Sequence, residues 1–73
     1  MNRYRIIYKY TDIDGCDLQI DDIFITSDTD LSQLLSVKQH EMIINICRAV
    51  VQLSEIYAAH TVQLVRIEKE QGS

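Results

Sequence analysis

The sequence predicts a small α+β domain of the order β-β-α-β, in which a three-stranded, mostly antiparallel sheet (strand order 2-1-3) packs on one long helix. Three observations lead to this fold class: an alternating run near the N-terminus, an Asp-Gly pair between two such runs, and a long helical pattern in the second half. A chain of 73 residues buries only about 60% of the surface that its extended form exposes. We therefore expect one domain over residues 1–70 and a disordered tail over 71–73, in which Gly72-Ser73 are candidate non-native residues.

Residues 3–10 alternate with the period of a β-strand. Tyrosine and isoleucine, which are frequent in strands, make up most of this run. We expect its two faces to differ, with an aromatic side toward the core and a cationic side away from it. The first side holds Tyr4, Ile6, Tyr8 and Tyr10, and the second holds Arg3, Arg5, Ile7 and Lys9.

A hairpin turn is predicted where Asp14-Gly15 separates the first strand from a second one over residues 18–26. Asp-Gly between two alternating runs is a strong short-range hairpin signal. The alternation of the second strand slips at Asp21-Asp22. This slip predicts either a β-bulge or two separately paired segments.

The cluster Ser27-Asp28-Thr29-Asp30 is rich in helix-capping residues and predicts a short helical turn through Leu31, Leu34 and Leu35. A bend near Ser36-Val37 should then lead into a long helix over residues 39–59, followed by a last strand over 61–68. A helix that crosses back over the hairpin can deliver this strand beside the first one, antiparallel to it. Placement beside the second strand would instead need a right-handed parallel crossover. We prefer the first arrangement because the first strand is the most regular.

The long helix has more apolar surface than one sheet can cover. Polar side chains occupy a wedge of only about 80°, whereas a helix that lies on one sheet needs an apolar stripe only a little wider than about 100°. We assign a first stripe to the sheet and a second, small-residue stripe to a symmetric helix–helix dimer; the alternative is that residues 31–37 cover this second stripe. The first stripe is Ile43, Ile46, Val50, Leu53 and Tyr57, and the small-residue stripe is Ile44, Cys47, Val51 and Ala58.

The charges are distributed unevenly along the chain. The formal net charge is −4, all seven aspartates fall between residues 12 and 30, and no lysine or arginine lies between Tyr10 and Val37. Such a surface favours a basic partner and repels phosphate backbones. The alternative is that each aspartate has a local role in a turn, at a helix start or on an edge strand. The predicted partner-binding residues are Asp12, Asp14, Asp17, Asp21 and Asp22.

No motif in the sequence indicates catalysis, a metal or a cofactor. A calcium loop that begins at Asp12 would need glycine at its sixth position and glutamate at its twelfth, but Gly15 is the fourth residue and Ile23 the twelfth. His40 and Cys47 would lie about 10 Å apart along a helix, too far for a nucleophile and its base. Two cysteines, no secretory segment and a longest apolar run of four residues favour a cytoplasmic protein away from the membrane.

These features together predict a non-enzymatic protein-interaction module, a homodimer whose acidic surface binds or inhibits a basic, nucleic-acid-handling protein. Its size, acidity and lack of catalytic motifs resemble the general type of phage or mobile-element accessory proteins, such as anti-CRISPR and anti-restriction inhibitors; this likeness rests on no motif. The alternative is a small regulatory or structural subunit that contacts nucleic acid through Arg3, Arg5 and Lys9. Because the tyrosines of the first strand should face the helix, we expect no base-stacking platform beside these cations.

Overall fold

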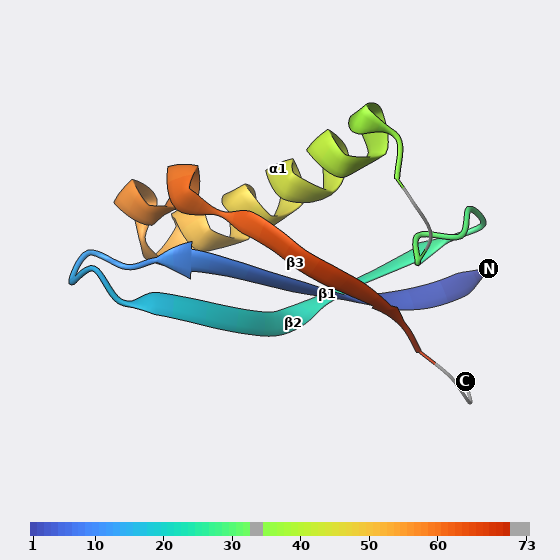
Figure 1. Ribbon diagram of the computed structural model, residues 1–73, viewed down its shortest axis with the longest axis horizontal. Helices are drawn as coiled ribbons and strands as arrows, with labels where there is room; N and C mark the ends of the chain where they lie inside the picture. Colours follow the sequence, from blue (N-terminus) through green and yellow to red (C-terminus); the bar gives the residue numbers. More distant parts are fainter. Residues whose placement is uncertain (33–34, 71–73) are drawn as a thin grey trace.

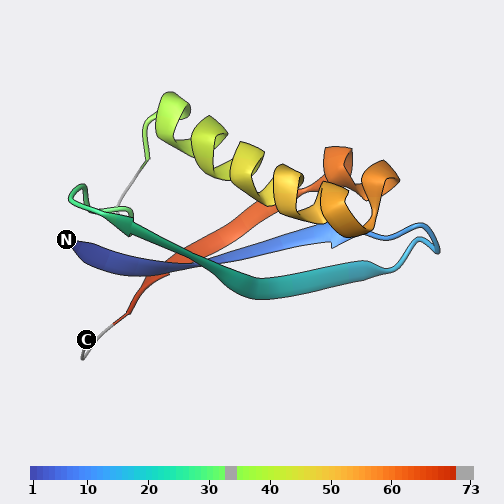
Figure 2. The ribbon, with the colours of Figure 1, turned by 180° about the vertical axis from the view of Figure 1, so that it is seen from behind.

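The computed structural model describes residues 1–32 and 35–70 and consists of two layers (Figure 1). One layer is an antiparallel sheet with the strand order β2-β1-β3, which confirms the predicted order. The helices cover one face of this sheet, and no element in the described ranges covers the other (Figure 2). The elements in chain order are β1 (Asn2–Thr11), β2 (Asp17–Ser27), α1 (Val37–Ser54), the 3₁₀ helix η1 (Ile56–Thr61) and β3 (Gln63–Lys69).

The central strand β1 supplies much of the core. Tyr4 and Ile6 are fully buried and Tyr8 is almost so, and all three belong to the main apolar cluster. Arg3 and Lys9, on the opposite side of the strand, are exposed. The predicted division of β1 into an inner and an outer face holds for these residues, whereas Ile7, which was predicted on the outer face with the cations, is only 2% exposed.

The hairpin forms at the predicted Asp-Gly pair. The amide of Gly15 donates to the carbonyl of Asp12 at 3.0 Å, and the amide of Asp12 donates to the carbonyl of Cys16 at 2.9 Å. Asp12 Oδ1 accepts two further hydrogen bonds, from the amides of Asp14 at 2.9 Å and Cys16 at 2.8 Å. Gly15 has a φ of +83°, a left-handed conformation that side chains disfavour.

The slip in the alternation of β2 is a β-bulge, one of the two predicted outcomes. Ile6 pairs with Ile23, whereas Tyr8, two residues further along β1, pairs with Ile20. The Asp21-Asp22 pair therefore lies opposite a single residue of β1. Because of the extra residue, Ile20 and Ile23 can both face inward although they are three positions apart in the sequence.

The long helix starts at Val37, two residues earlier than predicted, at the bend expected near Ser36-Val37. Ser36 is its N-cap, and a capping box joins Ser36 Oγ to the amide of Gln39 at 3.2 Å and Gln39 Oε1 to the amide of Ser36 at 3.0 Å. Asp30 instead accepts a hydrogen bond from the amide of Ser32 at 2.9 Å. The hydroxyl and the amide of Ser32 together hold the pKa of Asp30 below its usual value. Leu34, part of the short turn predicted here, lies outside the described residues.

The helix also ends earlier than predicted. The sequence pattern indicated a helix to residue 59, but α1 stops at Ser54 and the backbone of Glu55 leaves the helical region, with φ −141° and ψ 85°. The tighter 3₁₀ turns of η1 follow, and β3 starts two residues later than expected. Thr61 explains the change: its Oγ donates to the carbonyl of Ala58 at 2.7 Å and accepts from the amide of Thr11 at 2.9 Å. These bonds hold the end of η1 against the end of β1.

The structure contradicts the predicted dimer role of the small-residue stripe and part of the sheet assignment of the first stripe, whereas Ile43 is fully buried and Val50 packs against the core as predicted. The small-residue stripe, predicted to form a dimer interface, lies against the sheet and is buried within one chain. Leu53 and Tyr57, which were assigned to the sheet, are 89% and 76% exposed. The relative exposures in the small-residue stripe are 7% for Ile44, 0% for Cys47, 2% for Val51 and 3% for Ala58.

Packing volume accounts for the buried side of α1. Tyr4 and Tyr8 are the largest fully buried side chains, and both rise from β1 toward the helix layer. Protein interiors are close-packed, so the helix side that fits over these rings combines two isoleucines, Ile43 and Ile44, with smaller side chains such as Cys47. Leu31 and Leu35 also pack into this core. The segment after β2 therefore helps to cover the small-residue stripe, which was the alternative to a dimer, although the sheet covers it as well.

Candidate functional site

The five predicted partner-binding aspartates lie along one side of the molecule. Asp12 and Asp14 belong to the hairpin turn, and the other three lie on β2, an outer strand of the sheet (Figure 1). All are exposed except Asp12, which is half-buried. We call these residues the acidic edge; its members are Asp12, Asp14, Asp17, Asp21 and Asp22.

Most of these carboxylates also have a local structural contact. Asp12 caps the turn, Asp17 Oδ1 accepts from the hydroxyl of Thr11 at 2.7 Å, and Asp22 Oδ1 accepts from the hydroxyl of Tyr8 at 3.0 Å. These bonds fix the carboxylates in place but do not neutralise them. The predicted local roles and the predicted acidic surface therefore coexist in the same residues.

Among the described residues, one cation forms an ion pair with the acidic edge. This is Arg5, with its NH1 3.7 Å from Asp21 Oδ2. The same guanidinium is held more closely by Glu70 Oε1, at 3.0 Å from NH2. Because residues 11–36 contain no lysine or arginine, the negative potential along β2 is largely uncompensated.

The uncovered face of the sheet carries an aromatic ring that the sequence analysis did not place there. Phe24 pairs with Arg5 across β1 and β2, so both lie on the outer face. The ring is 42% exposed, and the guanidinium carbons of Arg3 and Arg5 lie 4.2 Å and 5.5 Å from its centroid. The slip at Asp21-Asp22 could have indicated this position in the sequence. A bulge there turns Ile23 inward, so the next residue, Phe24, faces outward.

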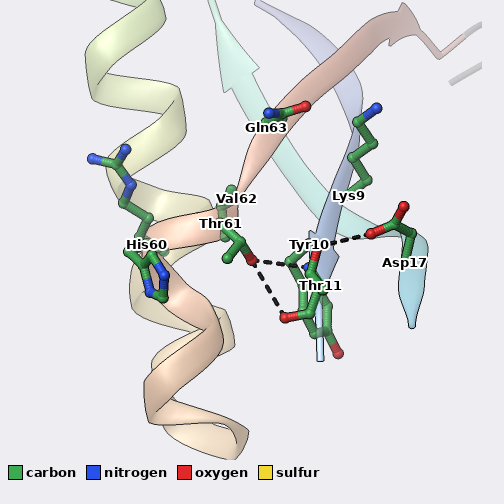
Figure 3. A pocket seen from close by; sticks show the side chains of 9 residues that line it. Lys9, Tyr10, Thr11, Asp17, His60, Thr61, Val62 and Gln63 are labelled. Atoms are coloured by element: carbon green, nitrogen blue, oxygen red, sulfur yellow. Dashed lines mark hydrogen bonds between the residues drawn. The ribbon is translucent and has the colours of Figure 1, made fainter. Parts of the chain in front are cut away.

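An open notch of about 590 Å³ lies where β3 begins, beside the end of β1 (Figure 3). Its lining includes three basic side chains, Lys9, Arg48 and His60. Figure 3 shows Lys9 and His60 on opposite sides of the Thr11–Thr61 pair, with Asp17 on the same side as Lys9. The hydrogen bonds between Thr11 and Thr61 occupy the centre, so the notch is a structural junction in which Lys9 and His60 do not converge.

The other groups with chemical potential are separated or buried. Burial raises the pKa of the Cys47 thiol to about 11, which keeps it protonated and unreactive at neutral pH. Cys16 is exposed on the hairpin. Within residues 1–32 and 35–70, no three histidine, cysteine or acidic side chains gather in a way that could hold a metal ion.

Neither helix of the described part of the chain is long and apolar enough to cross a membrane. Comparisons with protein-family models, with curated proteins and with solved structures found no match to this chain. The functional argument therefore rests on the surfaces described above.

Proposed function

We propose that this chain is a non-enzymatic protein-interaction module whose acidic edge binds a basic protein. The observation that carries this proposal is the acidic edge itself, five carboxylates on the hairpin and β2 with one arginine contact among them. Complementary charge steers association and selects partners. A protein that handles nucleic acid presents such a basic surface, so an inhibitor of the anti-CRISPR or anti-restriction type would need this charge layout.

The proposal is tested with a fluorescein-labelled deca-arginine peptide and fluorescence anisotropy. A variant with Asp14, Asp17, Asp21 and Asp22 all changed to Asn should bind the peptide at least about tenfold more weakly, because close charge pairs contribute more than about 1.4 kcal/mol to binding. The matched control removes four carboxylates elsewhere: Asp28→Asn, Glu41→Gln, Glu68→Gln and Glu70→Gln.

The control separates position from net charge, since both variants have the same charge. Equal weakening in the two variants would reject the acidic edge as the binding surface. Circular dichroism of each variant checks that the fold is retained. Capture from host lysate with the native chain and with the acidic-edge variant then identifies the basic protein.

The proposal includes self-association through the exposed side of α1, because the small-residue stripe is buried within one chain. An outer stripe with the spacing 4-3-4 faces solvent there, and 4-3 spacing is the pattern on which two helices pack. An antiparallel two-fold axis would set Met42 against Leu53 and Ile46 against Ala49, with uncharged Asn45 and Gln52 at the flank. Four side chains fall short of the roughly 800 Å² per partner of a standard interface, so the dimer should be weak. The outer stripe is Met42, Ile46, Ala49 and Leu53.

Sedimentation equilibrium tests the dimer. The native chain should associate at high micromolar concentration, and Leu53→Lys should be monomeric because the two-fold axis sets its charge against Met42 at both ends of the contact. The control Val37→Lys changes another strongly exposed apolar residue of α1, which lies outside the outer stripe. A native chain that stays monomeric throughout this concentration range would contradict self-association.

A second candidate function is nucleic-acid binding through Arg3, Arg5 and Lys9, which the exposed ring of Phe24 favours. Aromatic and arginine planes on an open sheet can stack on unpaired bases. Filter binding to single-stranded RNA and DNA, with a salt titration, tests it. Binding that weakens with salt and is lost in Phe24→Ala would support this function, and no binding at low salt would reject it.

A further inference from the structure

The end of the molecule where the hairpin meets η1 carries three large apolar side chains that face solvent. Ile13 is 77% exposed, Ile56 is 60% exposed and Tyr57 is 76% exposed. They come from distant parts of the chain, yet together they line one open cavity of about 300 Å³. We call this cavity the hairpin socket; its lining is Ile13, Ser54, Glu55, Ile56, Tyr57 and Ala58.

Glu55 is one of the residues that line the hairpin socket. Its Oε2 atom is shielded from solvent and accepts no hydrogen bond within the described residues. Burial raises the pKa of the neighbouring Tyr10, and the negative charge of Glu55 and a hydrogen bond between the two side chains raise it further. Tyr10 is thus a donor to this carboxylate, and Oε2 is the oxygen left without one, which is unfavourable for an atom removed from water.

The hairpin socket lies next to the acidic edge. Its lining residue Ile13 stands between Asp12 and Asp14 on the hairpin turn, and both aspartates belong to the acidic edge. Apolar walls, a carboxylate oxygen without a donor and the neighbouring acidic residues complement a side chain with an apolar stem and a cationic head. The ring of Tyr57 adds a surface on which such a head can stack.

We propose that the hairpin socket receives an arginine side chain of the basic partner. The stem packs against Ile13, Ile56 and Tyr57, and the guanidinium donates to the carboxylate of Glu55 after a rotation of that side chain toward the cavity. Arginine fits better than lysine because its planar fork matches a carboxylate and is more weakly hydrated than an ammonium group. This inference rests on the proposed function and names the anchor within the acidic edge.

The test is an NMR titration of the ¹⁵N-labelled chain with N-acetylarginine methylamide. The amides of Ile13, Ile56 and Tyr57 should shift and saturate, at least fivefold more readily than with the citrulline analogue, which has the same shape and no charge. Glu55→Gln should weaken this response at least threefold, whereas Glu41→Gln on the exposed side of α1 should leave it unchanged. Equal responses to arginine and citrulline, or none at these amides, would overturn the proposal.

The deca-arginine assay separates this inference from the proposed function. If Tyr57→Ala and Glu55→Gln bind the peptide as the native chain does while the acidic-edge variant does not, the hairpin socket is rejected and the proposed function stands. If the arginine derivative shifts the three amides but the native chain does not bind the peptide, the hairpin socket stands and the proposed function is rejected. At least fivefold weaker peptide binding by Tyr57→Ala supports both.

Discussion

The hydroxyl of Tyr8 donates a hydrogen bond to Asp22 Oδ1 at 3.0 Å and so ties a buried ring of the central strand to the bulge on β2. Tyr8 is only 2% exposed. Burial raises the pKa of Tyr8 above its usual range, and the hydrogen bond and negative charge of Asp22 raise it further. Asp22, a residue of the acidic edge, therefore also holds a buried side chain of the core in place.

Removal of this bond should destabilise the fold. We expect Tyr8→Phe to lower the free energy of unfolding by about 1–2 kcal/mol, because the bond joins a buried donor to a charged acceptor. Urea denaturation measures the loss. Tyr57→Phe, on an exposed ring, is the matched control and should change stability by less than about 0.5 kcal/mol. If both variants lose the same amount, the bond to Asp22 contributes nothing.

The bulge should tolerate the loss of one residue. Deletion of Asp21 makes Ile20 and Ile23 two positions apart, which restores a regular ladder with both isoleucines facing inward. The expected cost is about 1–3 kcal/mol, mainly because Asp22 then faces outward and loses its hydrogen bond from Tyr8, with smaller losses from the twist and the contact with Arg5. Deletion of Phe24 instead puts Ile23 and Ile25 on opposite faces and should prevent folding. Thermal unfolding followed by circular dichroism compares the two chains; equal damage would contradict the assigned register.

Truncation of a side chain should destabilise the fold strongly on the buried side of α1 and hardly at all on the exposed side. Ile44→Ala removes a buried side chain of the small-residue stripe and should cost about 2–5 kcal/mol of unfolding free energy. Leu53→Ala removes an 89% exposed side chain and should change the stability of the monomer by less than about 0.5 kcal/mol. Urea denaturation at low protein concentration avoids any contribution from association. A larger loss in Leu53→Ala would place the first stripe, and not the small-residue stripe, on the sheet.

Stability should fall at alkaline pH. The folded chain holds the pKa of Cys47 at about 11, above its ordinary value of 9.0. The thiol of the unfolded chain therefore ionises first, so its contribution is complete below pH 9.0 and is lost as the pH rises toward about 11. Urea denaturation across this range should show a shallower pH dependence for Cys47→Ser than for the native chain. Identical slopes would contradict the assigned burial.

Thiol labelling provides an independent check of the same placement. Iodoacetamide at neutral pH should modify exposed Cys16 at once and buried Cys47 only through unfolding. Mass spectrometry of peptides after brief exposure distinguishes the two sites. Early modification of Cys47 would show that the small-residue stripe does not lie against the sheet.

The strand half of the fold could be predicted because its signals are local. Alternation over β1, the Asp14-Gly15 turn and the slip at Asp21-Asp22 each constrain neighbouring residues through backbone geometry. The acidic edge was predicted for the same reason, since residues of one hairpin stay together in any fold that keeps the hairpin. By contrast, the hairpin socket joins Ile13 to Ile56, and no local signal connects residues so far apart.

The sequence by itself determined the strand order, the hairpin and the concentration of aspartates, because these depend on alternation, turn chemistry and composition. Only the tertiary structure decided which side of α1 meets the sheet. A helix that is apolar around most of its circumference has no preferred face by periodicity, so the choice falls to packing volume. The rings of Tyr4 and Tyr8 fill the space above β1, and close packing then selects the side of the helix on which smaller residues such as Cys47 accompany Ile43 and Ile44.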